Sequence, residues 1–221
     1  MRDLLRFKNS RAGQTVVLIG NGPSLKQEHL DALAWKYETF GSNKIYRLPF
    51  TPTYYAIIDE DMMDACLPLP QSFTPKEMFI RAEAGVGTPI YPIVAAGFSL
   101  DIANFVVMGG TVTYAMLQIL YYMGVTTVLL IGVDHHYPKA GGLIQGGQFV
   151  ALGPDPDHFV CADGLPYFDE GKVFNAPELD GTTQAYMIAK ELFDKSGRQI
   201  INLTPDTKLD VFNKDKLENW L

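Results

Sequence analysis

Short, unbroken apolar runs alternate with amphipathic stretches along this chain, and that alternation most constrains its fold. The clearest runs are TVVLIG (15–20) and TTVLLIGVD (126–134). Neither run alternates apolar with polar residues, which is typical of strands that helices cover on both faces. Strands and helices that alternate along a chain favour a mostly parallel sheet between two helical layers. We therefore expect a three-layer, Rossmann-like α/β fold.

The same patterns place the other elements. Apolar residues at helical spacing predict helices over residues 24–36, 109–124, 182–197 and, as a short closing helix, 213–221. Further strands are expected over residues 37–43, 51–59, 76–82, 88–94 and 198–204. Pro92 makes the strand at 88–94 an edge strand or a loop, because proline cannot donate a ladder hydrogen bond.

The length suits one domain that contains a lid. The 221 residues are 47% hydrophobic and 19% charged, which is normal for a folded globule with a sizeable core. Residues 138–181 are rich in Gly, Pro and Asp and form too long a stretch for an ordinary loop. We expect a single nucleotide-binding domain over 1–221, with 138–181 as a lid or binding excursion.

Composition also argues against several classes of protein. The formal charge of −7 argues against general nucleic-acid binding. No window of about 18 residues is continuously apolar, so no membrane span is expected, and the basic start lacks the apolar run of a signal peptide. Cys66 and Cys161 are far apart in sequence, so free thiols in the cytoplasm are the simplest interpretation.

Polar residues follow several of the expected strands. In open parallel sheets the ligand lies beyond the carboxyl ends of the strands, near the point where strand order reverses. The residues at these ends are Asn21, Ser24, Ser42, Asn43, Asp59, Asp134, His135 and His136. They are the first candidates for a binding site.

The turn GNGPSL (20–25) has the layout of a phosphate-binding turn. Gly20 and Gly22 allow a tight turn, Pro23 suits a first helical turn, and Ser24 could cap the helix or bind an oxygen. Free N–H groups at a helix start attract anions. There is no Walker-type lysine, and residues 41–43 offer no acidic side chain for an NAD ribose. A plain strand–helix turn is the alternative.

A second helix start, GGTVT (109–113), also carries glycines and hydroxyls. Free N–H groups after Gly110, together with the Thr111 hydroxyl, could bind a phosphate or a carboxylate. Thr111 could instead be an ordinary N-cap.

Carboxylates in IIDEDMM (57–63) raise the question of a metal. Asp59 and Asp61 have the short Asp-x-Asp spacing with which hard cations such as Mg²⁺ can be held. Asp59 follows a buried strand and is expected to contact a ribose or a substrate hydroxyl. Asp61 is better explained as a charge at a helix N-terminus.

Histidines are the candidate bases. The pair His135 and His136 lacks a third ligand at zinc spacing, so an acid–base or donor-contacting role for one of them is favoured over a metal site. His158, in DPDHF (155–159), suits deprotonation of a hydroxyl near neutral pH, and a surface-loop histidine is the alternative. Lys44 and Arg47 are the obvious cations near the expected site, and either could neutralise a diphosphate or a sugar carboxylate.

Several motifs resemble a known family. VVLIGNGPSL (16–25), FGSNKIY (40–46), the segment 109–137 and the tail 157–212 resemble a bacterial family of unknown function that is described as similar to the archaeal 6-hydroxymethylpterin pyrophosphokinase. Members of that family are often found among surface-polysaccharide enzymes. The same motifs resemble bacterial sialyltransferases that use a CMP-sugar donor. The resemblance implies a sialyltransferase-like fold.

The resemblance also implies roles for individual residues. Gly110 and Thr111 would hold the donor phosphate. The segment that carries the general base of the sialyltransferases is poorly matched, so His158 is the nearest candidate base and His136 the second. The residues that would contact the nucleotide, from the resemblance or from their place at the strand ends, are Gly20, Asn21, Gly22, Pro23, Ser24, Ser42, Asn43, Asp59 and Asp134.

Three functions follow as hypotheses. The leading one is a nucleotide-sugar-dependent glycosyltransferase that transfers a sugar to a hydroxyl-bearing acceptor. The favoured donor is a CMP-sugar, and no cofactor is firmly expected. The second is transfer of diphosphate from ATP to a hydroxymethyl pterin-like compound, with Asp59 and Asp61 on Mg²⁺. The third is a non-catalytic nucleotide-binding protein.

Overall fold

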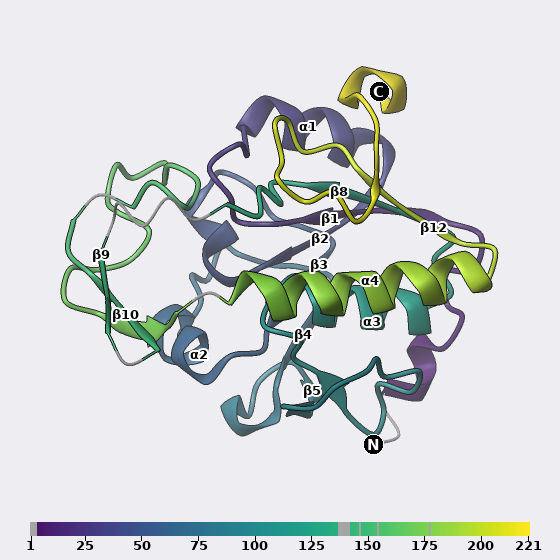
Figure 1. The fold of residues 1–221 in the computed structure, drawn as a ribbon, viewed down its shortest axis with the longest axis horizontal. Coiled ribbons are helices and arrows are strands. Elements are labelled where there is room, and N and C mark those ends of the chain that lie inside the picture. Colours follow the sequence, from purple (N-terminus) through teal and green to yellow (C-terminus); the bar gives the residue numbers. More distant parts are fainter. Residues whose placement is uncertain (1–3, 137–141, 146, 154, 177) are drawn as a thin grey trace.

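The computed structural model describes residues 4–136, 142–145, 147–153, 155–176 and 178–221 (Figure 1). Its α-helices are α1 (Gln27–Lys36), α2 (Glu60–Cys66), α3 (Val112–Tyr122) and α4 (Leu179–Lys195). Short 3-10 helices cover η1 (Leu4–Phe7), η2 (Asn43–Arg47), η3 (Ala82–Ala84) and η4 (Leu217–Trp220).

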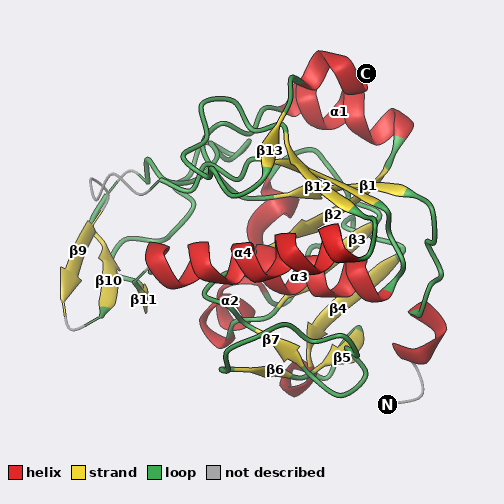
Figure 2. Ribbon diagram, turned by 45° about the vertical axis from the view of Figure 1, so that its right-hand side comes forward, coloured by secondary structure: helices red, strands yellow, loops and turns green. Residues whose placement is uncertain are grey.

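Eight parallel strands form the central sheet, in the order β13-β12-β8-β1-β2-β3-β4-β5. They are β1 (Thr15–Ile19), β2 (Glu38–Ser42), β3 (Tyr54–Ile57), β4 (Glu77–Arg81), β5 (Thr88–Ile90), β8 (Thr127–Ile131), β12 (Gln199–Asn202) and β13 (Asn213–Lys214). Helices lie on both sides of this sheet (Figure 2). The expected three-layer, mostly parallel α/β fold is therefore confirmed.

Strands β1 and β8 lie in the middle of the sheet, and this position explains why their sequences are apolar. They pair in register from Thr15 opposite Thr127 to Ile19 opposite Ile131. Alternate side chains of both strands enter two separate apolar cores, one on each face of the sheet. One core contains α3 and α4, and the other contains α1 and α2. With both faces covered, every position of the strand gains from being apolar.

Helix α3 is buried on nearly all sides and follows its sequence pattern closely. It begins after the N-cap Thr111, whose hydroxyl accepts a hydrogen bond from the amide of Thr113, and every residue from Val112 to Leu120 is buried. Gly124 follows it with a φ of +84°, as expected for a glycine that ends a helix.

Some expected boundaries are wrong. Helix α1 begins at Gln27 and not at residue 24, because the amide of Leu25 donates to Gly22 O and prolongs the turn. The expected closing helix at 213–221 is instead β13 followed by η4. The segment 88–94 divides at Tyr91 into the edge strand β5 and into β6 (Pro92–Ile93), which pairs with β7 (Val106–Val107). The helix N-terminus expected at Asp61 is that of α2, whose extent was not predicted.

The excursion expected at 138–181 contains regular structure of its own. It contains an antiparallel sheet of β9 (Gly142–Gln145), β10 (Gln148–Ala151) and β11 (Val173–Asn175), which lies at the left in Figure 1. Residues 155–168, here called the return segment, pack on the main domain. Phe159, Tyr167 and Phe168 belong to the apolar core that also contains α1 and α2. Residues 138–141, 146, 154 and 177 of the expected lid lie outside the described residues.

No helix in the described part of the chain combines the length and the apolar character that a bilayer crossing requires.

Candidate functional site

Strand order reverses between β1 and β8, which makes their carboxyl ends the natural place for a ligand. From β1 the chain builds the sheet outward through β2, β3, β4 and β5, and it then returns to add β8, β12 and β13 on the other side. The turn 20–25 and the segment 132–136 both leave the sheet at this reversal.

The turn after β1 packs directly on the end of β8. The amide of Gly20 donates to Ile131 O and that of Gly22 donates to Gly132 O, each at 2.8 Å. A Cβ atom on Gly20 would collide with the carbonyl of Gly132, and one on Gly22 would collide with the Asp134 carboxylate. These glycines therefore serve a close approach between two parts of the protein.

Asp134 closes this turn. The Ser24 hydroxyl donates to Asp134 Oδ2 at 2.8 Å, and the Ser24 amide donates to Asp134 Oδ1 at 3.3 Å. Burial raises the pKa of Asp134, and the Ser24 hydrogen bonds oppose part of that rise. The premise that the amides of Gly20, Gly22 and Ser24 are free for a phosphate is wrong, because the protein's own oxygens accept from them.

The start of α3 lies against the first turns of α4. Thr111 caps the helix, which agrees with the N-cap interpretation, and a Cβ atom on Gly110 would lie 2.6 Å from Thr182 Oγ1 in the first turns of α4. The neighbouring Thr183 Oγ1 lies 2.9 Å from Nε2 of His135. Asp134 and His135 thus connect the first glycine turn with α4, and Thr182 of α4 lies against the second.

Two buried amide oxygens at the ends of β1 and β2 lack a partner. Asn21 Nδ2 donates to Ser42 Oγ at 3.0 Å, but Asn21 Oδ1 accepts from no described residue. Asn43 Oδ1 is likewise unpartnered, while its residue adopts a φ of +50° and its carbonyl accepts from the Tyr55 hydroxyl at 2.5 Å. A buried acceptor without a donor costs about 1–3 kcal/mol, so this place favours a water or ligand that brings hydrogen-bond donors.

His158 is held next to the point where the return segment contacts Asn21. The amide of Phe159 donates to Asn21 O at 3.0 Å, which anchors the return segment to the end of β1. His158 Nδ1 lies 2.8 Å from Asp155 Oδ2, and the His158 ring stacks on Tyr167 with centroids 4.1 Å apart. These contacts leave Nε2 of His158 without a partner among the described residues.

The charge on Asp155 determines which nitrogen of His158 carries the proton. Burial by itself would raise the pKa of Asp155, but hydrogen bonds from His158 and from the amide of Asp157 outweigh it and lower that pKa. An ionised carboxylate can only accept, so Nδ1 donates and the lone pair of the neutral ring stays on Nε2. This is the arrangement of an oriented general base.

His136 and Asp157 complete the cluster. Asp157 is 7% exposed, and its Oδ1 has no partner in the described part of the chain. Burial, and then the charge of Asp155, raise the pKa of Asp157, while His136 acts to lower the pKa of both Asp134 and Asp157. His136 itself is exposed. Both candidate histidines therefore lie within electrostatic reach of Asp157.

The expected metal pair is placed at the start of α2. Asp59 is the N-cap residue, and burial, with the nearby Asp61 adding to it, raises its pKa. Asp61 Oδ2 accepts from Asn175 Nδ2 at 3.3 Å. No cluster of three or more His, Cys, Asp or Glu side chains suited to a metal ion occurs among the described residues.

Lys44 and Arg47 hold the return segment rather than facing the strand ends as free cations. Lys44 Nζ donates to Tyr167 O at 2.7 Å. Arg47 binds both oxygens of Asp163, and its Nη1 donates to Pro166 O at 2.6 Å. The expectation that either residue is available to neutralise a diphosphate is therefore wrong in this structure.

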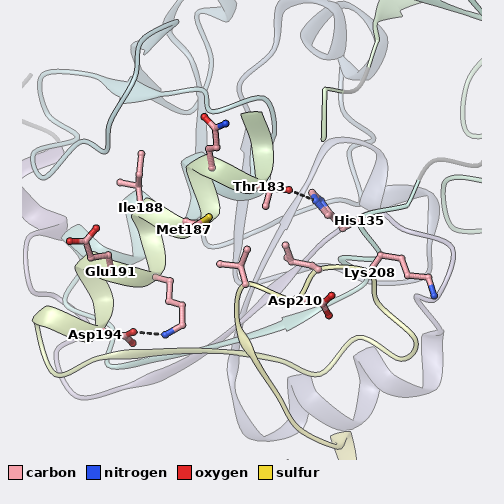
Figure 3. A pocket seen from close by; sticks show the side chains of 12 residues that line it. His135, Thr183, Met187, Ile188, Glu191, Asp194, Lys208 and Asp210 are labelled. Carbon is pink, nitrogen blue, oxygen red and sulfur yellow. Dashed lines mark hydrogen bonds and ion pairs between the residues drawn. The ribbon is translucent and has the colours of Figure 1, made fainter. Parts of the chain in front are cut away.

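A separate groove of about 940 Å³ runs between α4 and residues 208–211 (Figure 3). Its apolar floor includes Met187 and Leu209, and charged side chains such as Lys190 and Asp210 also line it. Of the expected site residues it contains His135 alone. The sequence analysis missed this groove, because α4 and 208–211 carry no motif that marks it.

The fold and the site thus define an α/β domain of parallel strands with a histidine–carboxylate pair at the strand-order reversal. No family model and no curated protein sequence matches the chain. Among solved structures, it is similar to the sialyltransferase CstII from Campylobacter jejuni in complex with a substrate analogue, cytidine-5'-monophosphate. The two chains are 12% identical with a TM-score of 0.45, over 92% of this chain and 85% of that one. A similarity this weak carries no argument about activity.

The packing of Gly20 predicts a large effect of one methyl group. Gly20→Ala should lower the free energy of unfolding by about 2–4 kcal/mol, because the new Cβ meets backbone that cannot move aside. Urea denaturation measures the change. Gly153→Ala is the control, since a Cβ there meets no atom within 4 Å; equal stability of both variants would contradict the packing at the reversal.

Asp155 and Asp157 should respond to pH in opposite directions. The pKa of Asp155 is lowered by folding, so its contribution to stability is present above the ordinary aspartate pKa and is lost as pH falls through the folded value. The pKa of Asp157 is raised by folding, so its contribution is present at low pH and is lost as pH rises through the folded value.

We therefore expect Asp155→Asn to cost less stability at pH 3 than at pH 6, and Asp157→Asn to become relatively more favourable over the same rise in pH. Thermal denaturation of the three proteins across this range is the measurement. Parallel curves for both variants would show that the two carboxyls do not have the opposed environments described above.

Proposed function

We propose that this chain is a nucleotide-sugar-dependent glycosyltransferase of the sialyltransferase-like kind, with His158 as its general base. The observation that carries the proposal is the Asp155–His158 pair, which the bond from Phe159 N to Asn21 O holds at the strand-order reversal. A base with an oriented, unpartnered nitrogen at the usual ligand position of a parallel sheet is suited to activating a hydroxyl group.

The reaction follows from that geometry. Nε2 of His158 accepts the proton of an acceptor hydroxyl while the hydroxyl oxygen attacks the anomeric carbon of the donor sugar. The bond between that carbon and the nucleotide phosphate breaks, and the nucleotide leaves with its electrons through an oxocarbenium-like transition state. Asp155 stabilises the imidazolium that forms, and the proton then passes from Nε2 to solvent.

The polar groups near His158 favour a ligand rich in hydroxyl or amino groups. Asn21 Oδ1 and Asn43 Oδ1 are acceptors that ribose hydroxyls or a base amino group would satisfy. Asp134 and Asp157 would repel a phosphate placed beside them. We therefore assign the nucleoside to the asparagines and its phosphate to the turn at Gly110 and Thr111, with the anomeric carbon between that turn and His158.

We place the reaction in the cytoplasm. Cys66 and Cys161 are both buried, free thiols, as is usual for proteins in a reducing compartment. The association with surface-polysaccharide synthesis rests on the family resemblance and is part of this proposal.

A nucleotide panel tests the proposal. CMP or UDP should raise the melting temperature without added metal, because the contacts assigned to the nucleotide are amide oxygens and a helix start. The panel is run in thermal-shift format with and without Mg²⁺. Stabilisation by ATP alone and only with Mg²⁺ would contradict the proposal and favour diphosphate transfer through Asp59 and Asp61.

Replacement of the base should separate chemistry from binding. His158→Ala should reduce transfer from a CMP-sugar by about 10²–10⁴-fold while the affinity for CMP stays unchanged, because the imidazole acts on the acceptor proton. His29→Gln, at a histidine of α1 that lies beside Glu28, is the matched control and should keep full turnover. Undiminished transfer by the His158 variant would refute the assignment, and loss of transfer in His136→Ala alone would move the role to His136.

A further inference from the structure

Lys44 is a buried cation with an unusual set of partners. Its residue is 5% exposed, and Nζ donates to the carbonyl oxygen of Tyr167 at 2.7 Å. Its own amide points to the hydroxyl oxygen of the same tyrosine at 3.4 Å. Lys44 therefore contacts Tyr167 at its backbone and at the far end of its side chain, and two such contacts fix the direction of the ring.

Tyr167 is in turn the surface on which His158 lies. The two rings are nearly parallel, at 13°, with centroids 4.1 Å apart, and Tyr167 is 2% exposed. Phe159 and Phe168 meet Tyr167 edge-on, at interplanar angles of 87° and 89°. A ring enclosed in this way has one orientation, so the imidazole stacked on it is held in one plane.

The position of Lys44 in the chain links this support to the ligand side of the site. Lys44 directly follows Asn43, whose Oδ1 is buried and has no partner among the described residues. Burial lowers the pKa of Lys44, because it disfavours the charged ammonium group. The hydrogen bond from Nζ to the Tyr167 carbonyl of the return segment offsets part of that cost.

We propose that Lys44 is a positioning residue for His158, acting through Tyr167. It fixes the tyrosine ring, the ring fixes the imidazole plane, and Asp155 then selects the nitrogen that faces the acceptor hydroxyl. This assignment rests on the proposed role of His158 as the base. In this proposal the Lys44 ammonium orients the base and does not neutralise a phosphate.

The test reads the state of the imidazole directly, by ¹⁵N NMR of histidine-labelled protein across a pH titration. In the wild type the neutral ring of His158 should be the Nδ1–H form. Lys44→Met, which keeps the length of the side chain but removes its donors, should give a mixture with the Nε2–H form. Lys8→Met, at an exposed position, is the control and should leave the His158 signals unchanged.

A pair of tyrosine variants keeps the test decisive if Lys44→Met fails to fold. Tyr167→Phe retains the ring and should preserve the Nδ1–H form, whereas Tyr167→Leu removes the stack and should lose it. Transfer activity should follow the same order, with kcat in Lys44→Met lowered about 10- to 100-fold and the affinity for CMP unchanged.

The two proposals fail in different ways. If the His158 signals of Lys44→Met and Tyr167→Leu match those of the wild type, the positioning role is overturned whatever the activity. If those signals change while His158→Ala still transfers sugar, the positioning contact stands and the choice of His158 as base is the part that fails.

Discussion

The close contact between the backbones of Gly20 and Gly132 is the constraint on which the rest of the site depends. It brings the turn after β1 onto the end of β8, where Gly20 and Gly22 donate to Ile131 O and Gly132 O. Asp134 can then reach Ser24, and the turn needs no ligand to be stable. Asn21 is thereby fixed with its carbonyl toward Phe159 and its side chain toward Ser42, which places the return segment and His158 at the strand-order reversal.

The placement of charge at this edge of the sheet has a consequence for recognition. The carboxylates of Asp134, Asp155 and Asp157 lie on the site side, whereas Lys44 and Arg47 donate to the backbone of the return segment. Cations used in this way stabilise the position of the return segment. The edge is therefore better suited to hydroxyl and amino groups than to a bare phosphate, a property that the glycine-rich turn alone would not suggest.

The sequence predicts the fold well where local pattern decides it and poorly where distant contacts do. Unbroken apolar runs identified β1 and β8, and the polar residues after the strands identified Asn21, Asn43, Asp134 and His136 as neighbours of one edge. The spacing in DPDHF also contained the partner of His158, because residues 155 and 158 lie three apart in a turn. The use of the turn amides by the protein itself depends on Asp134, which is 110 positions from Ser24, and no local pattern shows that contact. The same is true of Lys44 and Tyr167, which are 123 residues apart.

The central claim is that a nucleotide binds at the carboxyl ends of β1 and β2, next to the return segment that carries His158. Amide chemical-shift mapping during titration of ¹⁵N-labelled protein with CMP tests this claim most directly. The account predicts the largest shifts at residues 20–24, 42–44 and 155–159, with smaller ones at 109–113. Shifts confined to the groove between α4 and residues 208–211, with the strand ends unaffected, would contradict it.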